Sequence, residues 1–309
     1  MGDYPRTQAE FDARFATEAA CRAYLTQLRW PDGFRCPACE GAKAWAVRAV
    51  LWQCAACGRQ TSVTAGTIFQ DTRTPLTMWF RAMWGATSTK TGISALSLQQ
   101  VLGLGSYQTA WTWLHKLRRA MIRPGRDRLS GRVEVDETFV GGLGGAQGRS
   151  TATKALVIVA AEEVGRGIGR IRMRRIPDGK ARTLQAFIDE AIEPGSDVHP
   201  DGWDGYERVK IRYHHRVSYI RGHDALASEL LPRVHRVASL LKRWLLGTHQ
   251  GAVSDAHLDS YLDEFTFRFN RRTSQHRGKL FFRLVQQAVA VEPIPYRRLV
   301  QPGARRRRR

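Results

Sequence analysis

Residues 132–140 of this chain read Arg-Val-Glu-Val-Asp-Glu-Thr-Phe-Val, and this stretch decides how the second half of the chain folds. Val133 and Val135 alternate with the acidic Glu134 and Asp136, which is the pattern of a β-strand. Asp136 lies between apolar residues, where a carboxylate is costly unless it binds something. We therefore treat Asp136 as a candidate site residue. The alternative is a solvent-facing acid on an edge strand.

The chain beyond this strand continues with strand and helix patterns in a definite order. Two more strands are expected at 155–161 and 169–176, and an amphipathic helix at 181–192. A fourth strand should end near 199–201, followed by a helical turn near 206–210, a strand at 216–220 and a helix from about 233 to 246. The order β-β-β-α-β-α-β-α is that of the RNase H-like fold. We therefore expect an α/β catalytic domain of this class.

Two acids fall at one place in that topology. The middle of the first strand lies beside the end of the fourth, so Asp136 and Asp201 should be neighbours, with Asp204 in reserve for the second position. Carboxylates placed in this way can hold two divalent cations about 4 Å apart and drive in-line displacement at a phosphodiester. The Asp and Gly residues of 201–205 could instead form only a turn.

The cysteines predict a metal site near the N-terminus. Cys36-Pro-Ala-Cys39 and Cys54-Ala-Ala-Cys57 are two CxxC motifs separated by 14 residues. This spacing is typical of a zinc ribbon, in which four thiolates surround one structural Zn²⁺ with no open position. Two disulfides are the alternative, and they require an oxidising compartment that nothing in the sequence indicates. Cys21, the fifth cysteine, is expected to pack as a small apolar residue.

A helical segment should follow the ribbon. A lead-in helix is expected within 1–20, a helix from 75 to about 87, and two helices at 93–102 and 107–121 joined by a glycine turn. The last pair predicts a helix-turn-helix, or alternatively an ordinary αα-hairpin with a solvated basic face. Its second helix leads into a basic cluster, from which we expect DNA contacts by Lys116, Arg118 and Arg119.

The charge of the chain indicates a polyanionic partner. Lys and Arg number 49 against 28 Asp and Glu, a net charge of +21, and nucleic acid is the usual partner of such a protein. A second basic stretch, interleaved with phenylalanines, contains Arg271 and Arg272, and the arginine run 305–309 is expected to contact phosphates. The longest apolar run, 155–161, is too short to span a membrane, and no signal peptide is visible, so we expect an intracellular protein.

These patterns divide the chain into four regions. We expect a lead-in helix and zinc ribbon over 1–65 and a helical DNA-binding segment over 66–128. The RNase H-like domain should cover 129–285, and a basic tail 286–309.

Several motifs, in order, resemble one known family. They are residues 29–37 at the entry to the ribbon, 66–69 with Pro75-Leu76, 135–142, 201–203, 241–243, 257–258, 261–265 and 269–272. The chain resembles the IS1595-type insertion-sequence transposases, which have an ISXO2-like transposase domain. The resemblance implies a DDE-type recombinase that cuts double-stranded DNA at transposon ends and joins the freed 3′-hydroxyl to a target. It also implies catalytic Mg²⁺ or Mn²⁺, a homo-oligomer on DNA, and a cytoplasmic, nucleoid-associated location.

The resemblance also assigns two further site residues. The family's third metal-binding residue, commonly Glu or Asn, lies seven positions before the lysine of its Leu-Lys-Arg motif, which here is His235 before Lys242. Lys242 would bind the DNA phosphate near the scissile bond. Positions i and i+7 share a helix face, so both side chains can point at the active site.

A histidine at the third position departs from the family's pattern. It favours softer ions than Mg²⁺ and leaves the site one negative charge short of three carboxylates. Either His235 coordinates or orients through a ring nitrogen, or the enzyme is impaired and acts only as a DNA-binding protein, or His235 has no role. A zinc-ribbon regulator whose α/β domain mediates self-association is a third hypothesis, against which Asp136 and Asp201 argue.

Overall fold

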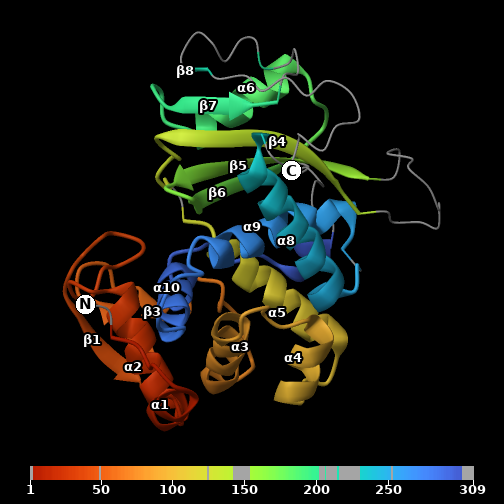
Figure 1. Cartoon of the computed structure of the whole chain (residues 1–309). Coiled ribbons are helices and arrows are strands. Elements are labelled where there is room, and N and C mark those ends of the chain that lie inside the picture. Colours follow the sequence, from red (N-terminus) through yellow and green to blue (C-terminus); the bar gives the residue numbers. More distant parts are fainter. Residues whose placement is uncertain are drawn as a thin grey trace. The chain divides into compact units, whose positions relative to one another are not determined.

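The chain forms two compact units in a computed structural model (Figure 1). The structure describes residues 3–48, 50–123, 125–141, 154–201, 206, 214–215, 230–251 and 253–300. Unit 1 comprises Met1–Arg123 and Ser274–Arg309, and unit 2 comprises Pro124–Thr273. None of the helices in the described ranges is long and apolar enough to cross a membrane.

Unit 2 is built on a five-stranded sheet. Its strands are β4 (Arg132–Val140), β5 (Ala155–Val164), β6 (Gly167–Ile176), β7 (Asp197–Pro200) and β8 (His214–His215). Their order in the sheet is β6-β5-β4-β7-β8. The first three in sequence are antiparallel, while β7 runs parallel to β4 and β8 parallel to β7. This arrangement is that of the RNase H-like fold and confirms the predicted class. The strand predicted at 216–220, and all of the turn at 206–210 except Tyr206, fall outside the described residues.

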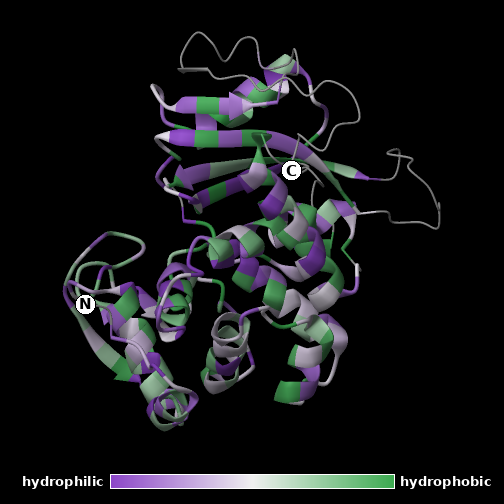
Figure 2. Cartoon of the chain, viewed as in Figure 1, coloured by the Kyte–Doolittle hydropathy of each residue, from purple (hydrophilic) through white to green (hydrophobic). Residues whose placement is uncertain are grey.

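Helices cover both faces of this sheet. Helix α6 (Ala181–Ala191) packs one face through residues such as Leu184 and Phe187, against alternate residues of β4. Helices α8 (Pro232–His249) and α9 (Leu258–Phe269) pack the other face, and a short 3₁₀ turn (Asp255–His257) precedes α9. The alternation of hydrophobic and hydrophilic residues is visible along β4 (Figure 2). Strand β5 is apolar throughout its middle because both of its faces are covered in this way.

Unit 1 contains the ribbon and a helical core. The ribbon is an antiparallel sheet of β1 (Ala44–Arg48), β2 (Leu51–Cys54) and β3 (Gln60–Ser62). The helices are α1 (Gln8–Arg14), α2 (Glu18–Arg29), α3 (Leu76–Ser88), α4 (Ala95–Leu102), α5 (Tyr107–Ala120), α10 (Gly278–Ala288) and α11 (Tyr296–Val300). The short lead-in helix expected within 1–20 is present as α1, whereas α2 was not predicted. Thr7 and Thr17 each accept a hydrogen bond as N-caps, and so start two separate helices.

Helix α10 belongs to unit 1, although the sequence prediction placed it in the catalytic domain with 129–285. Phe281 is fully buried there, and its ring lies 5.5 Å from that of Phe11, 5.6 Å from Phe15 and 5.8 Å from Phe80. This aromatic core accounts for the amphipathic pattern of α10, which the sequence alone did not assign to a partner. The chain therefore leaves unit 1 after Arg123 and returns to it at Ser274.

The predicted pair of helices is present as α4 and α5. Gly103 ends α4 in the left-handed conformation (φ 63°), which favours glycine, and the Ser106 side chain accepts a hydrogen bond from the Thr109 N–H at the start of α5. The two helices pack against each other. Entry of α5 into a DNA groove remains a prediction.

Candidate active site and zinc centre

Strand register brings the two predicted acids together in unit 2. Val135 of β4 pairs with Pro200 of β7 in a parallel ladder. The residues that follow this pair, Asp136 and Asp201, are therefore neighbours. Carboxylate oxygens of Asp136, Glu137 and Asp201 all lie within 4.8 Å of one another. Strand β4 lies between β5 and β7, so Asp136 is not the edge-strand acid of the alternative reading.

Glu137 is a site residue that the sequence reasoning missed. Alternation along β4 places it on the same side as Val133 and Val135, which face α6, and opposite to Asp136. The pairing of β7 with β4 ends at Val135, however, so the sheet has no β7 partner beside Glu137. The phenol of Tyr206, which is 1% exposed, donates a hydrogen bond to the Glu137 carboxylate. Tyr206 lies five residues after Asp201, and the periodicity of the sequence does not predict its hydrogen bond to Glu137.

The acids of this cluster are hard to ionise together. Burial, and after it the nearby Asp201 carboxylate, raises the pKa of Asp136 to about 7. Burial also raises the pKa of Glu137 to about 7, although the hydrogen bond from Tyr206 acts in the opposite direction. A bound cation would remove this mutual repulsion, because each carboxylate would then face a positive charge.

His235 lies at the start of α8 and faces the same cluster. Its Nε2 atom is 3.6 Å from Oδ2 of Asp136, which is too long for a hydrogen bond. This nitrogen is buried and has no hydrogen-bond partner among the described residues. His235 is not one of the three residues whose ligand atoms all lie within 4.8 Å. An unsatisfied nitrogen beside a group of carboxylates fits a site for a divalent cation.

Glu134 holds the start of α8 in place. Its carboxylate is 3% exposed and accepts hydrogen bonds from the backbone N–H groups of Arg233 (2.7 Å) and Val234 (3.0 Å), and from the Arg233 guanidinium (2.8 Å). An acid at a helix N-terminus satisfies backbone donors that lack partners within the helix. Glu134 thus fixes the turn of α8 that carries His235.

Removing this cap should destabilise unit 2. We expect Glu134→Ala to lower the free energy of unfolding by about 3 kcal/mol, because it leaves two backbone donors at the start of α8 unpaired and removes one of the two carboxylates that pair with Arg233, the other being Glu163. Chemical denaturation followed by circular dichroism measures this effect. Glu190→Gln is the matched control, because the Glu190 side chain is 63% exposed and pairs with Arg174 on the surface, so its loss should cost less than about 1 kcal/mol. Equal stability of the two variants would contradict the capping role.

Lys242 is exposed on α8, two helical turns beyond His235, and its charge opposes the rise in the pKa of Asp136. It also lines a cavity of about 640 Å³ at the end of β4. The other lining residues are Phe139, Val140, Gly141, Lys154, Ala155, Leu245, Leu246, Gln250, Gly251, Val253, Asp255 and Leu258. Because the Lys242 ammonium acts electrostatically on Asp136, it is a suitable group to bind a phosphate near the carboxylates.

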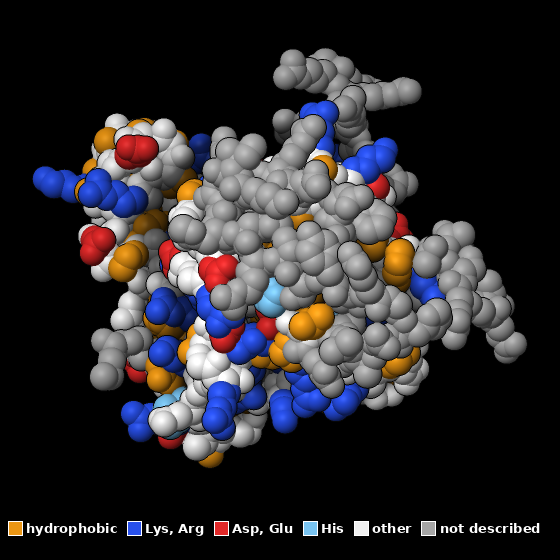
Figure 3. All heavy atoms as spheres, turned by 45° about the horizontal axis from the view of Figure 1, so that its top comes forward, with side chains coloured by type: hydrophobic (Ala, Val, Ile, Leu, Met, Phe, Trp, Pro, Cys, Tyr) orange, Lys and Arg blue, Asp and Glu red, His pale blue; other side chains and the backbone are white. Residues whose placement is uncertain are grey.

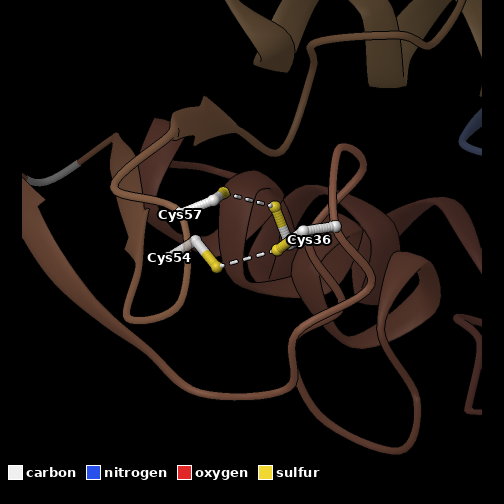
Figure 4. Close-up of side chains that lie close together, drawn as sticks. Cys36, Cys54 and Cys57 are labelled. Carbon is white, nitrogen blue, oxygen red and sulfur yellow. Dashed lines mark hydrogen bonds between the residues drawn. The ribbon is translucent and has the colours of Figure 1, made fainter.

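The four predicted cysteines of unit 1 form one cluster. The Sγ atoms of Cys36 and Cys57 are 3.7 Å apart and those of Cys39 and Cys54 are 3.6 Å apart, and all four thiols are free (Figure 4). They lie within 4.8 Å of one another, as a tetrahedral zinc requires. The disulfide alternative is therefore wrong for this structure. Cys21 is buried in the core, as predicted.

The surroundings of the cluster also fit a metal. Backbone N–H groups of Ala38 and Cys39 lower the pKa of Cys36 to about 6, which favours the thiolate that zinc binds. A Cβ atom at Gly41 would lie 3.3 Å from Sγ of Cys54 and 3.4 Å from Sγ of Cys39. Glycine at this position thus leaves space beside the sulfurs.

The basic residues predicted to contact DNA have different environments. Arg118 is 2% exposed and so is buried, whereas Lys116 and Arg119 are half-buried and burial lowers the pKa of both. The guanidiniums of Arg271 and Arg272 donate hydrogen bonds to the carbonyls of Phe267 and Phe269 and lie over those rings. These two arginines therefore donate hydrogen bonds to carbonyl groups at the C-terminal end of α9. Other Lys and Arg side chains are spread over the surface shown in Figure 3.

Comparison with known families identifies two domains in the chain. Residues 128–270 match the ISXO2-like transposase domain of the IS1595 type, and residues 16–60 match the transposase zinc-ribbon domain. A protein described as an uncharacterized protein in transposable element ISH50 of Halobacterium salinarum is 27% identical over 285 residues. The match covers 82% of this chain and 91% of that protein. The resemblance to IS1595-type transposases is thereby confirmed.

Two solved structures share a distant likeness. The catalytic core domain of BIV integrase is 16% identical, with a TM-score of 0.32, over 48% of this chain and 89% of that one. A chain of the simian T-cell lymphotropic virus intasome in complex with the PP2A regulatory subunit B56 gamma is 13% identical, with a TM-score of 0.33, over 59% of this chain and 70% of that one.

Proposed function

We propose that this chain, which carries the zinc-ribbon and ISXO2-like transposase domains of IS1595 insertion sequences, is a DDE-type DNA transposase. It cleaves the ends of its element and joins the freed 3′-hydroxyl to target DNA. The observation that carries this proposal is the convergence of the Asp136 and Asp201 carboxylates where β4 and β7 end their pairing. Such a pair, beside an unsatisfied imidazole nitrogen, suits the binding of divalent cations.

In this mechanism Asp136 and Asp201 would hold Mg²⁺ or Mn²⁺ at the scissile phosphodiester. When bound, these cations would supply activation of the attacking oxygen and stabilisation of the leaving 3′-oxygen. His235 faces Asp136 and contributes its ring nitrogen to the same site. Lys242 binds the phosphate next to the scissile bond, because its exposed ammonium lies on the same helix and near the carboxylates. The water used for cleavage is replaced by the freed 3′-hydroxyl for joining.

The partner is double-stranded DNA, both the transposon ends and the target. The net charge of +21 supports phosphate contacts, and Lys116 and Arg119 of α5 remain the candidates from the helical segment. Arg271 and Arg272, which are half-buried and exposed, stay candidates for phosphate contacts at the end of α9, and Arg118 stays a candidate although its side chain is buried. Two ends must be cut and joined together, so the active form is a homo-oligomer on DNA. With DNA as its substrate, the protein works in the cytoplasm at the nucleoid.

An assay of cleavage and joining tests the proposal. The DNA flanking the coding region is searched for terminal inverted repeats, and a labelled duplex of one end is incubated with the purified protein and a target plasmid. We expect a cut at the end of the repeat and a joined product with Mg²⁺ or Mn²⁺, and neither product in EDTA. Binding of the duplex with no cleavage in any metal would favour the second candidate, a transposase relative that only binds DNA.

The residue at position 235 separates these two candidates. We expect His235→Ala to lower cleavage by about tenfold, and His235→Glu to keep or raise activity with Mg²⁺, because a carboxylate supplies a hard oxygen ligand. The difference in cleavage rate between the native protein and the His235→Glu variant should be smaller with Mn²⁺ than with Mg²⁺, since Mn²⁺ accepts nitrogen ligands more readily. The rate of end cleavage in each metal is the measurement. Cleavage by His235→Glu alone would show that the native chain is the impaired relative, and full activity of His235→Ala would make His235 a bystander.

A further inference from the structure

The two aspartates of the candidate site supply too little negative charge to balance two divalent cations. Asp136 and Asp201 supply two negative charges, whereas two divalent cations carry four positive charges and the phosphodiester supplies only one more negative charge. A neutral His235 in the third position adds none. Mg²⁺ and Mn²⁺ prefer oxygen ligands. Another carboxylate within reach of both aspartates would therefore complete the site better than the imidazole does.

We propose that Glu137 is the third carboxylate ligand of the metal site, and that Tyr206 is the residue that positions it. This inference rests on the proposed function. A Glu137 oxygen lies within 4.8 Å of ligand oxygens of both Asp136 and Asp201, whereas His235 does not belong to that group. Glu137 comes from the same strand as Asp136, so the set requires no movement of α8.

The local structure explains how neighbouring residues on one strand reach one site. Side chains at adjacent strand positions normally point to opposite faces. Here the ladder of β7 with β4 ends at the pair Val135 and Pro200, so Glu137 has no ladder partner on β7 among the described residues. The Glu137 carboxylate can thus approach the aspartates where this ladder ends, while its backbone stays in register with Ile158 of β5.

Tyr206 gives this carboxylate a fixed position. Its ring is buried in the apolar cluster on the α6 face with Val133, Val135 and Phe187. Its hydroxyl donates to Oε1 of Glu137, which leaves Oε2 and the second lone pair of Oε1 as acceptors. A neutral donor orients the carboxylate without supplying a competing positive charge. This is the arrangement expected of a hydrogen bond that orients a metal ligand.

Titration of the full, zinc-loaded chain with Mn²⁺, followed by electron paramagnetic resonance of the free ion, tests this assignment. We expect Glu137→Gln, which keeps size and removes charge, to weaken Mn²⁺ binding by about tenfold or more. Asp136→Asn should do the same. Glu190→Gln, an exposed glutamate on α6, is the control and should bind like the native chain. Glu137→Asp keeps the charge but shortens the reach, so it should also bind weakly and serves if the Gln variant fails to fold.

The outcomes separate this inference from the proposed function. If Asp136→Asn weakens Mn²⁺ binding but Glu137→Gln and Glu137→Asp do not, Glu137 is not a ligand and the transposase proposal stands. If Asp136→Asn and Asp201→Asn bind Mn²⁺ like the native chain, the metal site itself is wrong and both proposals fall.

A double-variant cycle tests the role of Tyr206. Tyr206→Phe removes only the hydroxyl, and we expect it to weaken Mn²⁺ binding by about threefold to tenfold in the native background. In the Glu137→Gln background it should have no further effect, because the group that it positions has lost its charge. If Tyr206→Phe acted only through lost packing, it would weaken Mn²⁺ binding equally in the native and the Glu137→Gln backgrounds. Such additive effects, or no effect of Tyr206→Phe on the native chain, would overturn the positioning role.

Discussion

Replacing Asp136 or Asp201 by alanine is expected to abolish strand cleavage while leaving DNA binding nearly intact. Each substitution removes a carboxylate that the two-metal reaction needs, so the cleavage rate should fall by at least about a thousandfold. Phosphate contacts come from cationic side chains elsewhere on the chain, so the dissociation constant for duplex DNA should change by no more than about threefold. Single-turnover cleavage of a labelled end duplex and a mobility-shift titration measure the two quantities.

Two controls make this result interpretable. Glu190→Ala removes an exposed carboxylate from the same unit and should leave cleavage unchanged. Thermal unfolding of the Asp136 variant should show no loss of stability, because burial raises the pKa of Asp136 to about 7 and its ionised form is unfavourable in the absence of metal. Cleavage within tenfold of the native rate by either alanine variant would place the active site elsewhere.

Loss of zinc is expected to unfold the ribbon. The strands β1, β2 and β3 contain five, four and three residues, too few to form a stable sheet without the metal. We expect about one zinc per native chain, and less than a tenth of that in the double variant Cys54→Ser, Cys57→Ser, with loss of the amide signals of the ribbon in NMR spectra.

Cys21→Ala is the matched control for the ribbon. Cys21 is buried in α2, outside the group of four thiols, so this variant should keep its full zinc content. Native protein that contains no zinc, with its four ribbon thiols oxidised in pairs, would contradict the metal assignment.

The sequence predicted the elements whose periodicity or spacing is local. The alternation around Val133 and Val135 identified β4, and the two CxxC motifs identified the metal cluster, because each pattern is complete within a short stretch. The pairing of Asp136 with Asp201 followed from topology once the order of strands was known. These predictions did not require knowledge of side-chain packing.

The features that were missed depend on contacts between distant parts of the chain. Glu137 was not singled out from the sequence, because nothing local reveals that the ladder of β7 ends beside it or that Tyr206 donates a hydrogen bond to it. The sequence pattern predicted only that Glu134 is a polar residue of a strand, whereas its carboxylate caps a helix that begins about a hundred residues later. Helix α10 has an evident apolar face, but only the structure shows that its partner is the aromatic core near the N-terminus.

The central claim is that Asp136 and Asp201 hold the metal ions of a DNA-cleaving active site. Crystals of the full chain with a duplex of the element's end, soaked in Mn²⁺, test it most directly through anomalous diffraction. We predict anomalous peaks about 2.2 Å from carboxylate oxygens of both Asp136 and Asp201, next to the scissile phosphate. Crystals with DNA bound and Mn²⁺ present, but with no anomalous density at these two carboxylates, would contradict the account.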